Sequence, residues 1–176
     1  MEHREIATSE SVWAALRETD RLLKEASANY ERRMKKFEET MGSWSNNHGE
    51  FAEEYFFNSF ENGHHNFFGE EFDDISKNLK GTETKDEFDI VMLNGQSVGI
   101  VEVKFKAHLD DLPKVKEKAQ RFRTNFPKFT HHKIYLGLAS MAFYPQLEQE
   151  CVKEGIAVVK QVGDTVVIND AHLKAY

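Results

Sequence analysis

Residues 87–105, EFDIVMLNGQSVGIVEVKF, form the stretch on which the fold depends. Two runs of β-branched and apolar residues, 87–93 and 98–105, flank Asn94-Gly95-Gln96. Runs of this length and composition are typical of strands, and Asn-Gly between them is a strong signal for a tight hairpin turn. The stretch therefore predicts a β-hairpin.

The segments on either side of the hairpin predict a larger α/β domain. Apolar spacing and capping residues indicate a helix over 110–126, with Asp110 or Asp111 as its cap and Pro113 in its first turn. Two further helices are predicted, over 49–60 and 145–153. One strand is predicted to end near residue 81, and three more are predicted over 133–139, 156–160 and 165–168. The resulting order, αβββαβαββ, predicts an α/β fold in which helices flank a mixed central sheet.

A long helix is predicted to precede this domain. Steps of three and four residues from Ile6 to Met41 give eleven positions, of which eight are apolar, while charged residues fill the other faces. Such a narrow seam is typical of a coiled coil, and a helix of about 36 residues would be about 54 Å long. We expect residues 1–41 to form a helix that makes a homodimer through 6–41, and 42–176 to form the second domain. The alternative is a helix that folds back on its own domain.

Composition restricts the class of protein. The chain has 176 residues, with 23 Lys and Arg against 30 Asp and Glu, so its formal charge of −7 gives no case by itself for nucleic-acid binding. The single cysteine, Cys151, excludes an internal disulfide and a multi-cysteine zinc site. No stretch approaches the roughly 20 apolar residues of a membrane span. We expect a soluble cytoplasmic protein without a membrane partner.

Charged residues interrupt the predicted hairpin. Glu102 and Lys104 lie two apart, on one face of an apolar strand, and Asp89 lies in the partner strand. Burying such groups costs several kcal/mol unless they pair or bind an ion. One reading is an ion pair of Lys104 with Glu102 or Asp89. The other is a pair of carboxylate ligands for Mg²⁺, with Lys104 beside the reacting phosphate.

The pattern Asp89-x₁₂-Glu102-Val103-Lys104 resembles the PD-(D/E)XK nuclease superfamily, although Phe88 stands where many members have proline. The order of predicted elements agrees with the αβββαβ core of that restriction-endonuclease-like fold. Residues 49–53, GEFAE, resemble the first core helix of a bacterial branch in which a coiled coil also precedes the core.

The resemblance implies roles for individual residues. Asp89 and Glu102 would be ligands of Mg²⁺, with Mn²⁺ as a substitute, and Glu53 would complete the acidic set, with Glu50 and Glu54 as competitors for that place. Lys104 would position the attacking hydroxide. The helix after E-x-K often carries Gln or a basic residue in this superfamily, and Gln120 occupies such a place.

Local charge is distributed unevenly along the chain. Residues 104–133 hold nine basic and three acidic side chains, whereas 50–89 hold twelve acidic and three basic ones. The basic segment predicts either a nucleic-acid surface or an ordinary solvated helix face. The adjacent pairs His64-His65 and His131-His132 lack a third ligand at metal spacing. Cys151 is expected to be a packed core residue.

These observations lead to two hypotheses. The first is a metal-dependent nuclease that hydrolyses phosphodiester bonds in nucleic acid, with DNA as the expected substrate, bound through 104–133. The second is a dimeric binding or adaptor protein that keeps the nuclease-like fold without turnover.

Overall fold

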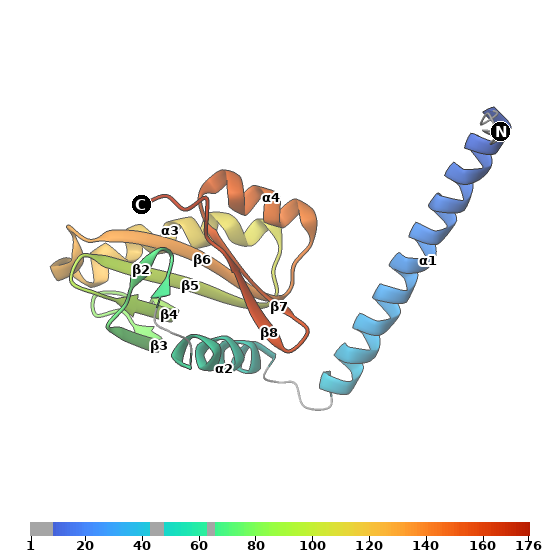
Figure 1. Cartoon of the computed structure of the whole chain (residues 1–176). Helices are drawn as coiled ribbons and strands as arrows, with labels where there is room; N and C mark the ends of the chain where they lie inside the picture. The colour runs from blue at the N-terminus through green and yellow to red at the C-terminus, as the bar shows by residue number, and fades with distance from the viewer. Residues whose placement is uncertain (1–8, 43–47, 63–65) are drawn as a thin grey trace. The chain divides into compact units, whose positions relative to one another are not determined.

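The computed structural model describes residues 9–42, 48–62 and 66–176, and the chain divides into two compact units, 1–46 and 47–176 (Figure 1). Each unit is described by itself. Two predicted features, the start of the seam at Ile6 and the pair His64-His65, lie outside the described residues.

Helix α1 (Ser9–Gly42) makes up the described part of the first unit and confirms the predicted long helix. Two seam residues, Trp13 and Leu23, are 63% and 65% exposed. Asp20, also on the seam, makes an ion pair of 2.7 Å with Lys24 one turn further along the same helix. Helix α1 therefore does not cover these seam residues within its own unit, and the dimer stays a prediction.

The second unit is built on a six-stranded mixed sheet in the order β3-β4-β5-β6-β7-β8. Pairing is antiparallel except for β5 with β6 and β6 with β7, which are parallel. The predicted hairpin is β4 with β5. The strands are β3 (Asp74–Lys80), β4 (Glu87–Leu93), β5 (Ser97–Lys106), β6 (Lys133–Ala142), β7 (Ala157–Val162) and β8 (Thr165–Asn169).

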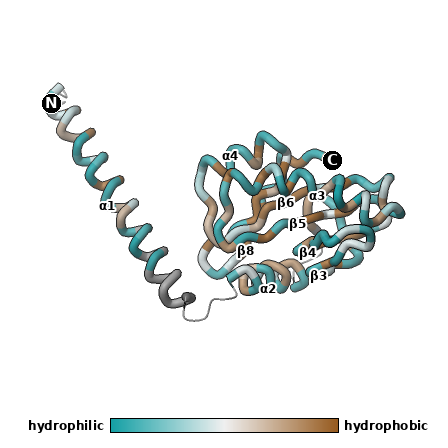
Figure 2. The backbone as a smooth tube through the Cα atoms, turned by 180° about the vertical axis from the view of Figure 1, so that it is seen from behind, coloured by the Kyte–Doolittle hydropathy of each residue, from teal (hydrophilic) through white to brown (hydrophobic). Residues whose placement is uncertain are grey.

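Helices cover both faces of this sheet (Figures 1 and 2). Helix α2 (His48–Glu61) buries Phe56 and Phe60 in a core on one face, while α3 (Leu112–Asn125) and α4 (Pro145–Glu154) bury Phe122 and Leu147 in a core on the other. Each core buries large apolar side chains, which is the dominant favourable contribution to folding. The expected mixed sheet flanked by helices is confirmed. Short 3₁₀ helices at Leu109–Asp111 and Pro127–Phe129 precede and follow α3.

A small hairpin, β1 (Asn66–Phe67) with β2 (Glu70–Glu71), was not expected from the sequence. Its two turn residues, Phe68 and Gly69, have positive φ angles of 57° and 72°. Such a conformation is uncommon for phenylalanine, so the sequence carries no ordinary turn signal there. Phe68 packs where Gly99 and Gly137 leave room, because a Cβ on Gly99 would lie 3.1 Å from its ring.

The regular alternation of side chains between the two faces of the sheet is interrupted in both β3 and β4, near the start of β4. Ile75 packs in the core under α2, whereas Leu79, four residues along β3, packs in the core under α3 and α4. In the same way Phe88 and Ile90 of β4 pack in opposite cores. Residues two or four apart in a regular strand share a face, so the pleat is interrupted between these residues. Asn78 lies at the interruption on β3 and has a left-handed φ of 52°.

Candidate active site

Asp89 lies where strands β4 and β5 stop pairing. The ladder runs from Leu93↔Val98 to Ile90↔Val101. One residue beyond it, Oδ2 of Asp89 accepts a hydrogen bond of 2.7 Å from the backbone N–H of Val103. The carboxylate therefore takes the place that a strand carbonyl has in a continuing ladder, and it is fixed beside β5.

Glu102 and Lys104 project from β5 on one face, as the strand period predicts. Nζ of Lys104 donates a hydrogen bond of 2.8 Å to Oε1 of Glu102. Glu102 is only 8% exposed, whereas Lys104 is half-buried. The ion pair considered from the sequence is therefore present, and it occupies one of the two carboxylate oxygens.

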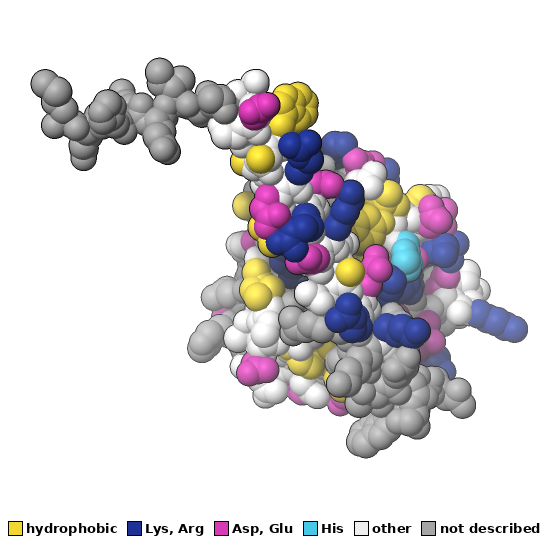
Figure 3. Space-filling view, turned by 90° about the vertical axis from the view of Figure 1, so that its right-hand side faces the viewer, with side chains coloured by type: hydrophobic (Ala, Val, Ile, Leu, Met, Phe, Trp, Pro, Cys, Tyr) yellow, Lys and Arg dark blue, Asp and Glu magenta, His cyan; other side chains and the backbone are white. Residues whose placement is uncertain are grey.

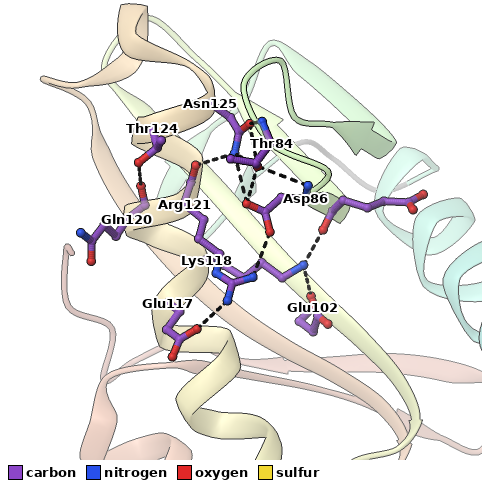
Figure 4. Close-up of polar contacts among 10 residues, drawn as sticks. Thr84, Asp86, Glu102, Glu117, Lys118, Gln120, Arg121, Thr124 and Asn125 are labelled. Carbon is purple, nitrogen blue, oxygen red and sulfur yellow. Dashed lines mark hydrogen bonds and ion pairs between the residues drawn. The ribbon is translucent and has the colours of Figure 1, made fainter.

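Lys118 of α3 reaches the same carboxylate from the helix side (Figure 4). Its Nζ lies 2.9 Å from Oε2 of Glu102 in an ion pair without hydrogen-bond alignment, and it also donates to the backbone carbonyl of Glu87. The ammonium lies 5.2 Å from the centre of the Phe88 ring, and the Lys118 side chain is 14% exposed. Glu102 is thus held between two ammonium groups.

The three groups on β4 and β5 have shifted pKa values. Burial, and then the charge of Glu102, raise the pKa of Asp89 to about 7. Burial acts in the same direction on Glu102, but the hydrogen bond from Lys104 and the charge of Lys118 outweigh it and lower the pKa of that carboxyl. Burial opposes the charge of Lys104, yet Glu102 raises the pKa of the ammonium. Within this pair the raised pKa belongs to Asp89 and the lowered pKa to Glu102.

Glu53 is the residue of α2 that the structure brings to this group. Its side chain is half-buried. Burial raises the pKa of its carboxyl, and the nearby polar side chain of Asn78 acts against that rise. The charges of Lys104 and Glu102 also act on it. Of the two competitors, Glu54 is exposed and ion-paired with Lys77 of β3, and Glu50 is exposed.

Gln120 does not lie with the other predicted site residues. Its side chain is exposed and points away from Glu102, while its backbone carbonyl accepts a hydrogen bond of 3.2 Å from Thr124 (Figure 4). Lys118, which we did not single out, takes the position facing the site. A helical-period signal was available, because Lys118 lies three residues after buried Val115 and four before buried Phe122.

A second polar cluster, here called the loop clamp, lies beside the first and consists of Thr84, Asp86, Arg121 and Asn125 (Figure 4). Asn125 is 1% exposed and accepts hydrogen bonds from the backbone N–H groups of Glu83 and Thr84, at 3.1 and 2.9 Å. It donates to Thr84 Oγ1 at 2.9 Å and to Asp86 at 3.3 Å. A hydrogen bond from Thr84 and an ion pair of 2.9 Å with Arg121 lower the pKa of Asp86.

The donor set of the site suits a hard cation in its chemistry. Asp89, Glu102 and Glu53 offer carboxylate oxygens, and Mg²⁺ takes one or two carboxylates with water and phosphate oxygens. The raised pKa of Asp89 reflects its burial first and the neighbouring charge of Glu102 second. Over 9–42, 48–62 and 66–176, however, no three His, Cys, Asp or Glu side chains are grouped as metal ligands. A cation at Glu102 would therefore have to replace one ammonium contact.

The basic segment 104–133 does not form one free positive surface. Besides the two lysines on Glu102, Lys116 pairs with Glu154 at 2.7 Å, and Arg121 pairs with Asp86 and Glu117. Arg123 donates to backbone carbonyls, including that of Tyr176 at 2.7 Å. Outside this segment, basic and acidic side chains are interspersed on the face shown in Figure 3. Much of the positive charge is therefore used within the fold.

The remaining candidate groups have structural surroundings. Cys151 is fully buried in the core under α3 and α4, and burial raises the pKa of its thiol to about 12. His131 is exposed, and His132 packs edge-on against Phe129. Among the helices described, none has the length and apolar character needed to cross a membrane.

Comparison with protein-family models, with curated proteins and with solved structures finds no match to this chain. The functional proposal therefore depends on the side chains around Asp89 and Glu102 and on the topology that carries them.

Proposed function

We propose that the second unit is a metal-dependent phosphodiesterase of the PD-(D/E)XK type that hydrolyses nucleic acid, with DNA as the expected substrate. The observation that carries this proposal is the meeting of Asp89, Glu102 and Lys104 where β4 and β5 stop pairing, with the pKa of Asp89 raised to about 7. Strongly shifted pKa values cluster at functional sites. The order α2-β3-β4-β5-α3-β6 supports a restriction-endonuclease-like αβββαβ core.

Each side chain has a role that follows from its surroundings. Asp89 and Glu102 would hold Mg²⁺ or Mn²⁺, with Glu53 as the third carboxylate. A bound divalent ion supplies Lewis-acid stabilisation of phosphate charge and lowers the pKa of its bound water. Lys104, half-exposed beside Glu102, orients the attacking oxygen and offsets charge on the phosphate. Lys118 fixes the rotamer of Glu102 from the helix side and is a positioning residue.

A dimeric binding or adaptor protein is the second candidate, and a specific observation favours it. Both oxygens of Glu102 contact an ammonium group, so the site balances its own charge. The internal pairing of Lys116 and Arg121 points the same way, because it removes charge that a polyanion would contact. In this candidate, α1 is the main interaction element.

We also propose that α1 mediates a homodimer in either case. Trp13, Leu16 and Leu23 are more than half exposed along one seam of a 34-residue helix. Pairing of two such seams would remove these side chains from water, at about 25 cal/mol per Å² of apolar surface. Analytical ultracentrifugation of the full chain and of a variant with Leu16→Glu and Leu23→Glu tests this. We expect the full chain to sediment as a dimer and the variant as a monomer.

The deciding experiment measures cleavage of supercoiled, linear, branched and single-stranded DNA and of RNA, each with Mg²⁺ and Mn²⁺. We expect Asp89→Asn and Lys104→Met to lower the cleavage rate by about 10³-fold, or ~4 kcal/mol of transition-state stabilisation. Asp86→Asn is the matched control, since this carboxylate belongs to the loop clamp, and it should retain cleavage. Absence of cleavage across the panel, together with no metal-dependent rise in melting temperature, would favour the adaptor.

A further inference from the structure

The two lysines that contact the Glu102 carboxylate reach it from different elements. Lys104 lies two residues further along β5, and its Nζ donates a hydrogen bond of 2.8 Å to Oε1. Lys118 lies on α3, and its Nζ is 2.9 Å from Oε2 (Figure 4). Because each ammonium contacts a different oxygen, one contact can be lost while the other remains.

Lys118 is the more firmly held of the two. Besides its ion pair with Glu102, its ammonium donates to the backbone carbonyl of Glu87 and lies 5.2 Å from the centre of the Phe88 ring. A largely desolvated ammonium with several such contacts is costly to move, because each contact would have to be replaced. Lys118 is therefore a fixed counter-ion of Glu102.

Lys104 is held by fewer contacts. Within the part of the chain that the structure describes, its ammonium hydrogen-bonds Glu102 and no other group. The Lys104 side chain is 36% exposed, against 14% for Lys118. Water can replace the carboxylate around an ammonium with this much access to solvent, and ion pairs of this kind contribute little stability. Lys104 is thus the contact that a competing cation can replace.

We propose that Lys104 is an exchangeable internal cation, which neutralises Glu102 while no divalent ion is bound and gives up Oε1 when Mg²⁺ or Mn²⁺ binds. Lys118 keeps the carboxylate in place during the exchange. The released ammonium of Lys104 is then available to a phosphate oxygen of the substrate. Cation binding and the readiness of Lys104 are coupled in this way. This inference rests on the proposed function.

Amine acylation of the wild-type chain tests the exchange. The full chain is treated briefly with an N-hydroxysuccinimide ester of acetic acid, with and without Mg²⁺, and each lysine is followed by mass spectrometry. We expect Mg²⁺ to raise the acylation rate of Lys104 by about fivefold, since reaction follows the released fraction. Lys118 should stay protected, and Lys116, which pairs with Glu154, is the control whose rate should not change. An unchanged rate at Lys104 in the presence of bound Mg²⁺ would overturn the inference.

Isothermal titration calorimetry with Mn²⁺ gives a second readout. Lys104→Met removes the competing ammonium and should tighten Mn²⁺ binding by about tenfold, because the fraction of binding-competent sites rises. Lys118→Met removes the support of Glu102 and should weaken binding by about tenfold, as loss of a group that orients a ligand does. Lys106→Met removes an exposed charge from the same strand and should bind within about twofold of the wild type. Equal tightening in all three variants would reduce the effect to charge alone and overturn the inference.

Failure of this inference and failure of the proposed function are distinguishable. Mn²⁺ binding without any gain in Lys104→Met would overturn the exchange and leave the function intact. Release of Lys104 by Mg²⁺ without cleavage of any nucleic acid would overturn the function and leave the exchange intact. Absence of Mn²⁺ binding in both the wild type and Lys104→Met would overturn both.

Discussion

Asp86 and Asp89 lie three residues apart in sequence, and each contacts a group on a neighbouring element, Arg121 of α3 for Asp86 and Val103 of β5 for Asp89. Their surroundings nevertheless differ in kind. Asp86 belongs to the loop clamp, where hydrogen bonds and Arg121 lower its pKa. Asp89 is buried beside Glu102, and its pKa is raised to about 7. The loop clamp favours the charged form of the Asp86 carboxylate and so stabilises the fold. The surroundings of Asp89 disfavour the charged form of its carboxylate. The difference separates a structural polar cluster from a candidate reactive one.

The largest effect on stability is expected within the loop clamp. Asn125→Ala removes hydrogen bonds to two backbone amides and to the Thr84 hydroxyl, all from a residue 1% exposed. Leaving such groups unpaired costs about 1–3 kcal/mol each, and with partial access of water we expect a total loss of about 3 kcal/mol. Urea unfolding measures it. Gln120→Ala, exposed on the same helix, is the control, and equal midpoints for the two variants would contradict the prediction.

A smaller loss is expected when the site loses one of its two lysines. Lys118→Met leaves Oε2 of buried Glu102 without its ammonium while Lys104 still holds Oε1. Because breaking a buried pair is costly but one cation remains, we expect a loss of about 2 kcal/mol at pH 8. Lys116→Met, which removes an exposed pair with Glu154, should leave the unfolding midpoint unchanged. Equal effects of the two changes would show that Glu102 does not depend on Lys118.

The smallest effect should be a gain in stability. The pKa of Asp89 is about 7 in the folded protein and near 4 when unfolded, so the folded state binds the extra proton between these values. Its stability therefore falls as pH rises from about 4 to about 7. Asp89→Asn removes this dependence and should be more stable than the wild type by about 1–2 kcal/mol at pH 8, and by little at pH 4.

Asp86→Asn should behave in the opposite sense. The pKa of Asp86 is lowered, so its contribution is present above the unfolded value near 4 and is lost as pH falls through the lower folded value. Thermal melts of both variants across pH 3–8 test the contrast. A loss of stability at pH 8 in both variants would remove the distinction between loop clamp and site.

Much of the fold was predictable because its elements carry strong local signals. The Asn94-Gly95 turn and the flanking apolar runs indicate β4 and β5, and the spacing of Leu112, Val115, Ala119 and Phe122 indicates α3. The hairpin β1–β2 was missed, because Phe68 adopts a turn conformation that its residue type disfavours. Tertiary packing over Gly99 and Gly137, rather than local preference, accounts for that turn.

The site was predictable to the extent that it lies on regular structure. The shared face of Glu102 and Lys104 follows from the strand period, whereas the role of Glu53 rests on the resemblance and stays a prediction. Lys118 was not recognised, because a lysine within a basic run resembles an ordinary surface residue until the buried stripe of α3 is known. The left-handed backbone of Asn78 on the neighbouring strand could not be predicted, since the interruption in β3 and β4 depends on how two cores divide the side chains of both strands.

The burial of Cys151 has a practical consequence for the study of α1. It is the only cysteine of the chain, and with its thiol enclosed and its pKa near 12 it is protected from reaction with disulfide-forming and labelling reagents. A cysteine introduced at exposed Ser9 would therefore be the one accessible thiol. Two chains that pair side by side in the same direction would bring these thiols together and form a covalent dimer on oxidation, whereas chains in opposite directions would hold them a helix length apart.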